Sequence, residues 1–188
     1  MNVGRDKIYP DCPTLIRTVE VGGLTKSQLL QKLQQHSILM NKLGERLFAD
    51  DKFTISDTIY SVRAVEPKVR DLGFPEGTTI PQLFEKANQV GLKLCPLELG
   101  PHLRLEYLDQ PEGHSGKPSW RHRAPYGSVT IASEILSKDV DFPKGFYLRR
   151  IEGALWLRGY IADDLHVLEP DDHFVFCQNE NLKKKIPY

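Results

Sequence analysis

The chain has 188 residues, 40% hydrophobic and 27% charged, which is enough to bury the core of one domain. Its 25 basic and 25 acidic side chains balance, which excludes recognition of nucleic acid or membrane through a global charge. Three widely spaced cysteines and the lack of a long apolar run predict a cytoplasmic protein without a disulfide framework, a membrane span or a membrane partner.

The sequence predicts a single folded domain over residues 14–180. Residues 1–13 contain Pro10 and Pro13 but few apolar side chains, which predicts an irregular lead-in. Residues 181–188 include three consecutive lysines, and short charge runs of this kind are usually solvated. We therefore expect a basic tail after the domain.

Two helices are predicted early in the chain. Thr25 and Gln28 have the spacing of a capping box, which places the first helical residue at Lys26. The apolar stripe of this helix breaks around residues 36–38 and then resumes at helical spacing. A second helix, or a kinked continuation of the first, is therefore expected to end near Phe48.

A third helix and two strands complete the first half. Thr79 and Gln82 have the spacing of another capping box, and Gly91 supplies the positive φ that often ends a helix. Strands are predicted over 15–21 and 59–65, where β-branched and aromatic residues concentrate.

The second half is expected to consist mainly of strands joined by turns. Leu103, Leu105 and Tyr107 alternate with charged residues, which predicts a half-buried strand. Further strands are predicted over 128–133 and 174–177. The whole pattern predicts an α+β domain, with N-terminal helices packed on a mainly antiparallel sheet that ends in a hairpin and meander.

The best-specified element is a β-hairpin over 145–160, in which two aromatic and aliphatic runs flank Glu152 and Gly153. A two-residue turn needs positive φ, which Gly153 adopts without steric cost. One hairpin face is then mostly apolar, and the other alternates rings with guanidinium groups. The expected register pairs Ile151 with Ala154, Arg149 with Trp156, and Tyr147 with Arg158.

Two segments, LCPLELGPHLRLEYLDQPEG and GFYLRRIEGALWLRGY, resemble a set of uncharacterised bacterial proteins of unknown function. The resemblance covers roughly the second half of the chain. It implies a bacterial, intracellular protein, and it carries over no catalytic or binding residue.

Common cofactor enzymes are disfavoured, because the sequence has no phosphate-binding loop, dinucleotide fingerprint, paired-cysteine motif or nucleophile elbow. No cofactor is therefore predicted. Cys95 and His102 can in principle act as nucleophile and base. Because Cys95 stands in an apolar segment, a buried and unreactive thiol is the expected state.

One enzyme alternative stays open, a metal-dependent hydrolase. Six carboxylate and imidazole side chains fall within eleven residues and offer ligands for a divalent metal. Their spacing matches no defined site, and turn chemistry alone favours the same residues. The six are Asp163, Asp164, His166, Asp171, Asp172 and His173.

The leading hypothesis is a non-enzymatic module that binds a partner protein. Arginine and aromatic side chains lie together on one hairpin face and on the preceding polar loop, a composition typical of protein hot spots. Single-stranded nucleic acid is the alternative partner. A ladder in which arginines cover neighbouring rings, with no partner, explains the same residues. The candidate residues are Trp120, Arg121, Arg123, Arg149, Trp156, Arg158 and Tyr160.

Overall fold

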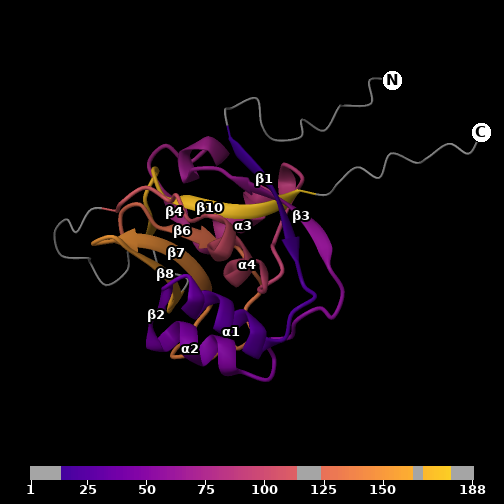
Figure 1. Cartoon of the computed structure of the whole chain (residues 1–188). Coiled ribbons are helices and arrows are strands. Elements are labelled where there is room, and N and C mark those ends of the chain that lie inside the picture. Colours follow the sequence, from indigo (N-terminus) through magenta and orange to yellow (C-terminus); the bar gives the residue numbers. More distant parts are fainter. Residues whose placement is uncertain (1–13, 114–123, 163–166, 179–188) are drawn as a thin grey trace, which may run out of the picture.

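The computed structural model describes residues 14–113, 124–162 and 167–178. An eight-stranded sheet of order β1-β3-β10-β6-β7-β8-β2, with β5 paired to β10, forms its centre (Figure 1). A separate pair joins β4 to β9. The strands are β1 Leu15–Val21, β2 Leu39–Met40, β3 Tyr60–Glu66, β4 Thr78–Thr79, β5 Leu92–Lys93, β6 Val129–Ile131, β7 Gly145–Ile151, β8 Ala154–Tyr160, β9 Val167–Leu168 and β10 His173–Gln178.

The fold is α+β, with a sheet that is mixed and mostly antiparallel. Two of its pairs are parallel, β6 with β10 and β2 with β8. No helix among the described residues is long and apolar enough to cross a membrane. The helices are α1 Lys26–Gln35, α2 Lys42–Ala49, α3 Ile80–Gln89 and α4 Leu99–Glu106, and a 3₁₀ turn, η1, spans Val69–Leu72.

Helix α1 begins where the capping box predicts. The Gln28 N–H donates to Thr25 Oγ1 at 3.1 Å, and the Thr25 N–H donates to Gln28 Oε1 at 2.9 Å. These two bonds satisfy backbone donors that have no partner inside the helix. The predicted break and second helix are also confirmed, since α2 ends at Ala49.

We expect Thr25→Ala to lower the free energy of unfolding by about 1 kcal/mol, because the Gln28 N–H loses its acceptor. Thermal unfolding measures the loss. Ser27→Ala is the matched control, since Ser27 is an exposed hydroxyl residue inside the same helix turn. An unchanged midpoint for Thr25→Ala would show that the cap contributes nothing to the stability of α1.

The predicted strand over 103–107 is wrong, because these residues belong to α4 and its C-cap. Leu99 and Leu103 stand one turn apart, and both are fully buried. Pro101 lies in the first turn, where backbone N–H groups have no acceptor inside the helix, so proline removes no helical hydrogen bond. The alternation that suggested a strand involves only three apolar residues, and burial on several sides of α4 hides the helical period.

Two hydrophobic cores lie on opposite faces of the sheet. Side chains of α1, α2 and α4 pack with Val175 of β10 in one core, whereas α3 packs with Phe174 and Phe176 in the other. Successive residues of a strand point to opposite faces, so this division follows from the alternation along β10. The hairpin contributes Leu148 and Leu157 to the first core.

The N-terminus of α2 is fixed directly to β8. Asn41 Oδ1 accepts from the N–H groups of Gly44 and Gly159, each at 2.8 Å, and Asn41 Nδ2 donates to the Gly159 carbonyl at 3.0 Å. A Cβ at Gly159 would lie 2.6 Å from the carbonyl carbon of Leu43. Glycine at this position therefore allows the helix backbone to contact the strand.

Candidate binding surface on the hairpin

Strands β7 and β8 form the hairpin that the sequence predicts. Each expected pair is present, with Ile151 opposite Ala154 and Arg149 opposite Trp156. Both turn residues have positive φ, 51° at Glu152 and 75° at Gly153. These values are those of a type I′ turn, whose twist matches that of the flanking strands.

One hairpin face is core and the other is half-buried. Leu148 and Leu157 are fully buried on the core side. The opposite face is only partly exposed, because Trp156 is half-buried and Tyr147 is 9% exposed. We call this second face the hairpin surface, and its residues are Tyr147, Arg149, Trp156, Arg158 and Tyr160.

Arg158 organises the hairpin surface. Its guanidinium group lies 5.0 Å from the Trp156 ring centroid and 5.9 Å from that of Tyr147. The Tyr147 and Tyr160 rings are 6.4 Å apart. The ladder expected from the sequence has Arg158 over Tyr147 and Arg149 over Trp156. The first contact is present, but Arg158 rather than Arg149 lies over the Trp156 ring. One cation therefore bridges rings on both strands.

Among the described residues, the two arginines of the hairpin surface lack some of the hydrogen-bond and ion-pair partners that a guanidinium group can have. Register places Arg149 and Arg158 at diagonal positions on the two strands. The Nε atom of each is buried and has no hydrogen-bond partner. Burial lowers the pKa of Arg149, and the nearby Arg158 charge also lowers it. Within the described ranges, neither arginine forms an ion pair with a carboxylate.

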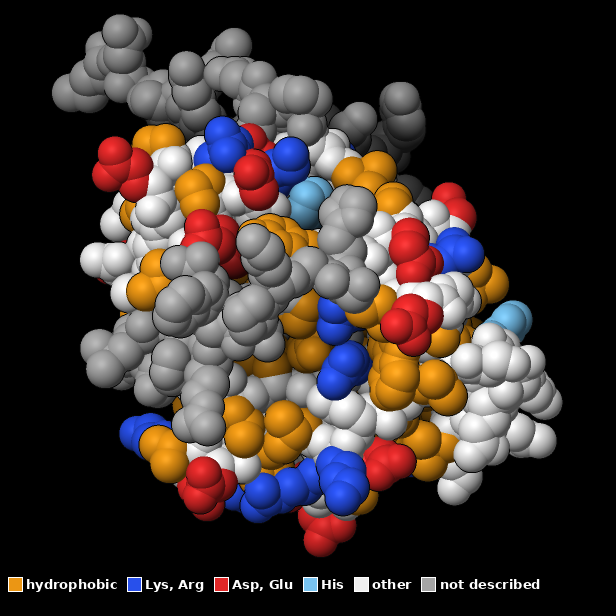
Figure 2. All heavy atoms as spheres, turned by 90° about the vertical axis from the view of Figure 1, so that its left-hand side faces the viewer, with side chains coloured by type: hydrophobic (Ala, Val, Ile, Leu, Met, Phe, Trp, Pro, Cys, Tyr) orange, Lys and Arg blue, Asp and Glu red, His pale blue; other side chains and the backbone are white. Residues whose placement is uncertain are grey.

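Figure 2 faces the side on which β7 and β8 lie in Figure 1. In the middle of this side, basic side chains lie among hydrophobic ones. Of the predicted loop residues, Trp120, Arg121 and Arg123 lie outside the described residues. The structural evidence for a binding surface therefore comes from the hairpin residues.

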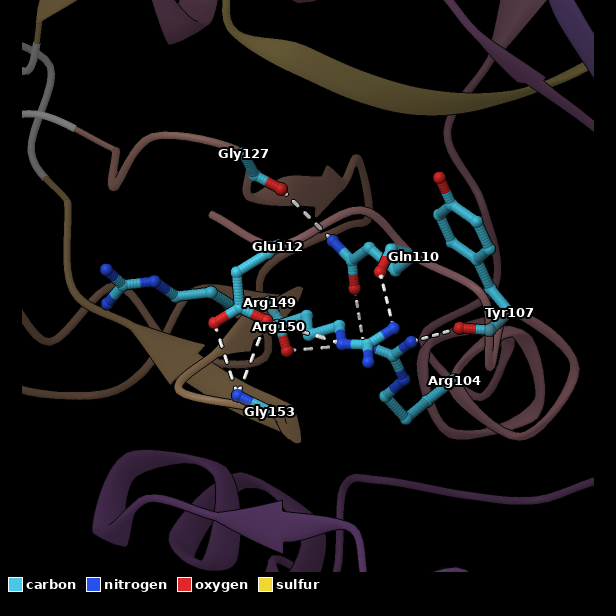
Figure 3. Close-up of polar contacts among 8 residues, drawn as sticks. All are labelled: Arg104, Tyr107, Gln110, Glu112, Gly127, Arg149, Arg150 and Gly153. Atoms are coloured by element: carbon cyan, nitrogen blue, oxygen red, sulfur yellow. Dashed lines mark hydrogen bonds and ion pairs between the residues drawn. The ribbon is translucent and has the colours of Figure 1, made fainter. Parts of the chain in front are cut away.

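A buried arginine supports the hairpin from α4 (Figure 3). Arg104 is fully buried, and its Nη1 donates to Gln110 Oε1 at 2.6 Å and to the Trp156 carbonyl at 3.3 Å. It also donates to the carbonyls of Tyr107 and Arg149. Burial lowers the pKa of Arg104 to about 10. All of these acceptors are uncharged, so the cation is held by a cage of neutral oxygens.

Gln110 and Glu112 extend this support along β7. Gln110 Nε2 donates to the carbonyls of Gly127 and Leu148, each at 3.1 Å. Glu112 accepts from the turn N–H of Gly153 at 3.2 Å and lies 3.4 Å from the Arg150 Nε. Arg104 and Gln110 are not among the predicted site residues, because the segment that holds Arg104 was predicted to be a half-buried strand.

The acidic and histidine cluster does not converge on a metal site within the described residues. Asp163, Asp164 and His166 lie outside them. In the part of the chain that the structure describes, no three potential metal ligands come together.

The described members of that cluster have separate partners. Asp171 pairs with Arg70 at 2.8 Å, and Asp172 accepts from the Glu169 N–H at 2.8 Å. His173 Nδ1 lies 3.3 Å from Glu66 Oε1. Burial raises the pKa of Asp172 to about 6. The contacts of Asp171 and Asp172 fit the turn interpretation, and His173 is the first residue of strand β10.

Cys95 and His102 also have separate partners. The Cys95 side chain is 4% exposed, and its thiol donates to the Val175 carbonyl at 3.4 Å. Burial raises the pKa of this thiol. His102 Nε2 instead accepts from the Gly22 N–H at 3.2 Å. The predicted burial of Cys95 is confirmed, and the raised pKa keeps the thiol protonated.

Comparison of the chain with protein-family models, with curated proteins and with solved structures gives no match. Any function of the hairpin surface must therefore be inferred from its geometry. The resemblance to bacterial proteins of unknown function stays a prediction.

Proposed function

We propose that this chain is a non-enzymatic binding module whose hairpin surface binds an acidic segment of a partner protein. The pair Arg149 and Arg158 carries the proposal. Both are half-buried cations on one face, and neither forms an ion pair with a carboxylate of the described residues. A partner carboxylate offers each of them a charge-assisted hydrogen bond and relieves their mutual repulsion.

The aromatic side chains prepare this surface for binding. Arg158 rests against the rings of Trp156 and Tyr147, which limits the conformations that it would lose on binding. Tryptophan, tyrosine and arginine are also the residues most often found at binding hot spots.

The chemistry favours a protein over single-stranded nucleic acid. Nucleic-acid sites combine a row of cations along the phosphate backbone with ring faces free to stack on bases. Here the described surface has two arginines, and Arg158 already covers the Trp156 ring. The chain as a whole is also neutral. A short acidic protein segment requires fewer cations than a nucleic acid.

The double variant Arg149→Gln with Arg158→Gln is expected to bind acidic peptides about tenfold more weakly, equivalent to roughly 1.4 kcal/mol. The probe is a fluorescein-labelled pool of Asp- and Glu-rich peptides, and fluorescence anisotropy gives the affinity. Arg63→Gln is the matched control, since Arg63 is an exposed arginine on β3. Added salt should weaken wild-type binding, because part of the attraction is between exposed charges.

Three results would count against this function. Equal peptide affinity for the wild type and the double variant would indicate that the arginines and rings of the hairpin surface stabilise the strands and bind no partner. Tighter binding of a labelled oligothymidylate that depends on the same arginines would indicate nucleic acid as the partner. No binding of the wild type to any peptide in the pool would remove the proposal. Circular dichroism of each variant checks that the fold is retained.

A further inference from the structure

A pocket of about 560 Å³ lies away from the hairpin surface. Its wall consists of residues 52–56 before β3, residues 94–98 before α4, and Glu134 and Leu136 after β6. Pockets that bind small molecules have volumes of roughly 300 to 1,000 Å³. The size and concave shape of this pocket therefore suit a small ligand.

Glu98 is the buried polar group of the pocket wall. Its side chain belongs to a residue that is 5% exposed, and both carboxylate oxygens are held in place. The Tyr60 hydroxyl donates to Oε1 at 2.5 Å, and the Ser56 N–H donates to Oε2 at 3.1 Å. A carboxylate oxygen accepts more than one hydrogen bond, so Glu98 retains acceptor capacity for a ligand.

Glu98 has no cationic partner among the residues that the structure describes. His102 follows one helical turn later, but its Nε2 accepts a hydrogen bond from the Gly22 N–H. Burial lowers the pKa of His102, and Lys32 lowers it further, against the opposite effect of Glu98. His102 is therefore neutral and supplies no counter-charge. A buried carboxylate without a counter-ion is unfavourable, which makes a cationic ligand stabilising.

The other charged groups of the pocket do not neutralise the Glu98 carboxylate. Lys52 lies on the wall, and its ammonium group donates to the Leu136 carbonyl at 3.5 Å. Glu134 adds a second carboxylate at the wall. Burial and the neighbouring Glu98 raise the pKa of Tyr60, so its hydroxyl stays protonated and remains a donor to Glu98. Two carboxylates against one lysine give the pocket a net negative charge.

The remaining wall is mainly apolar. Its hydrophobic members can hold the hydrocarbon body of a ligand whose polar end meets Glu98. They are Phe53, Ile55, Leu94, Pro96, Leu97 and Leu136.

We infer that this pocket binds a small apolar molecule that carries a protonated amine, with Glu98 as its counter-ion. The ammonium group donates to the Glu98 carboxylate, and the apolar wall surrounds the hydrocarbon part. This inference is independent of the function proposed for the hairpin surface, because none of the five hairpin-surface residues lines the pocket.

The test is a titration of the isotope-labelled chain, followed by two-dimensional amide NMR, with n-hexylammonium, n-hexanol and n-hexanoate. These probes share one hydrocarbon chain and differ in the charge of the head group. Hexylammonium is expected to shift the Ser56 amide signal with a Kd about tenfold below that of hexanol, and hexanoate to bind most weakly. Ser56 reports on the site because its N–H donates to Glu98.

Variants separate the charge of Glu98 from the shape of the pocket. Glu98→Gln should weaken hexylammonium binding about tenfold and change hexanol binding less than about twofold. Glu134→Gln is the control, an exposed carboxylate of the same wall, and should have a much smaller effect. Leu136→Trp, which keeps Glu98 and fills the pocket, should abolish the Ser56 shift, and it serves as the test if Glu98→Gln does not fold.

Equal affinities for the three probes would show that the head-group charge plays no part and would overturn the inference. No shift of the Ser56 signal with hexylammonium at its solubility limit would overturn it as well. So would hexylammonium binding that is unchanged in folded Glu98→Gln, or that is unchanged in Leu136→Trp.

Discussion

Replacement of Arg104 by Ala is expected to lower the free energy of unfolding by about 3 to 5 kcal/mol. The side chain is fully buried and donates to Gln110 Oε1 and to three main-chain carbonyls. Its loss removes a donor from all four oxygens, and a buried acceptor with no other donor, such as Gln110 Oε1, costs about 1 to 3 kcal/mol when left unpaired. The cavity left by the side chain adds to this cost, whereas removal of a desolvated cation offsets part of it.

Denaturant unfolding at equilibrium measures the effect. Arg104→Met keeps most of the buried volume without the donors, so a loss of about 2 kcal/mol or more is expected for it. Arg63→Ala, at an exposed arginine of β3, should change stability by less than about 0.5 kcal/mol. If Arg104→Met were as stable as the wild type, the carbonyls of β7 and β8 would not depend on this arginine.

Leu157→Ala is expected to cost about 2 to 5 kcal/mol, and Trp156→Ala is expected to cost less. Leu157 is fully buried on the core face of β8, so its truncation leaves a cavity beside Leu148, its partner across the hairpin. Trp156 is half-buried on the hairpin surface, where its truncation mainly removes the contact with Arg158.

Denaturant unfolding of both variants compares the two faces. For peptide binding the order should be reversed. Among folded molecules, Trp156→Ala should lower the affinity for acidic peptides more than Leu157→Ala does. A larger loss of stability for Trp156→Ala would place its ring in the core, and the hairpin surface would then lose its basis as a binding site.

Local interactions made several elements predictable. The helix start at Lys26 depends on hydrogen bonds between residues three apart, and the hairpin register depends on a two-residue turn. Gly91 has a φ of 85° just after α3, as its place at the predicted helix end requires. In each case the interacting residues are neighbours in the sequence, so the local sequence pattern is sufficient to predict the element.

The error at α4 shows where this information ends. Leu103, Leu105 and Tyr107 fit a strand as well as a helix, because three residues do not separate a period of 2 from one of 3.6. The helix is favoured by packing of Leu99 and Leu103 against distant segments. The short strands β2 and β5 are also unpredictable, since each is two residues long and exists through its pairing with β8 or β10.

By itself, the sequence determined the α+β class, the hairpin with its arginine and aromatic face, and the starts of α1 and α3. Only the tertiary structure decided the sheet order, the covering of Trp156 by Arg158, and the cage around Arg104. Two of the three carbonyls that hold Arg104 come from residues 45 and 52 positions later in the chain. The pocket at Glu98 likewise combines three separate segments. Such sites depend on long-range packing, which brings together residues that no local pattern links.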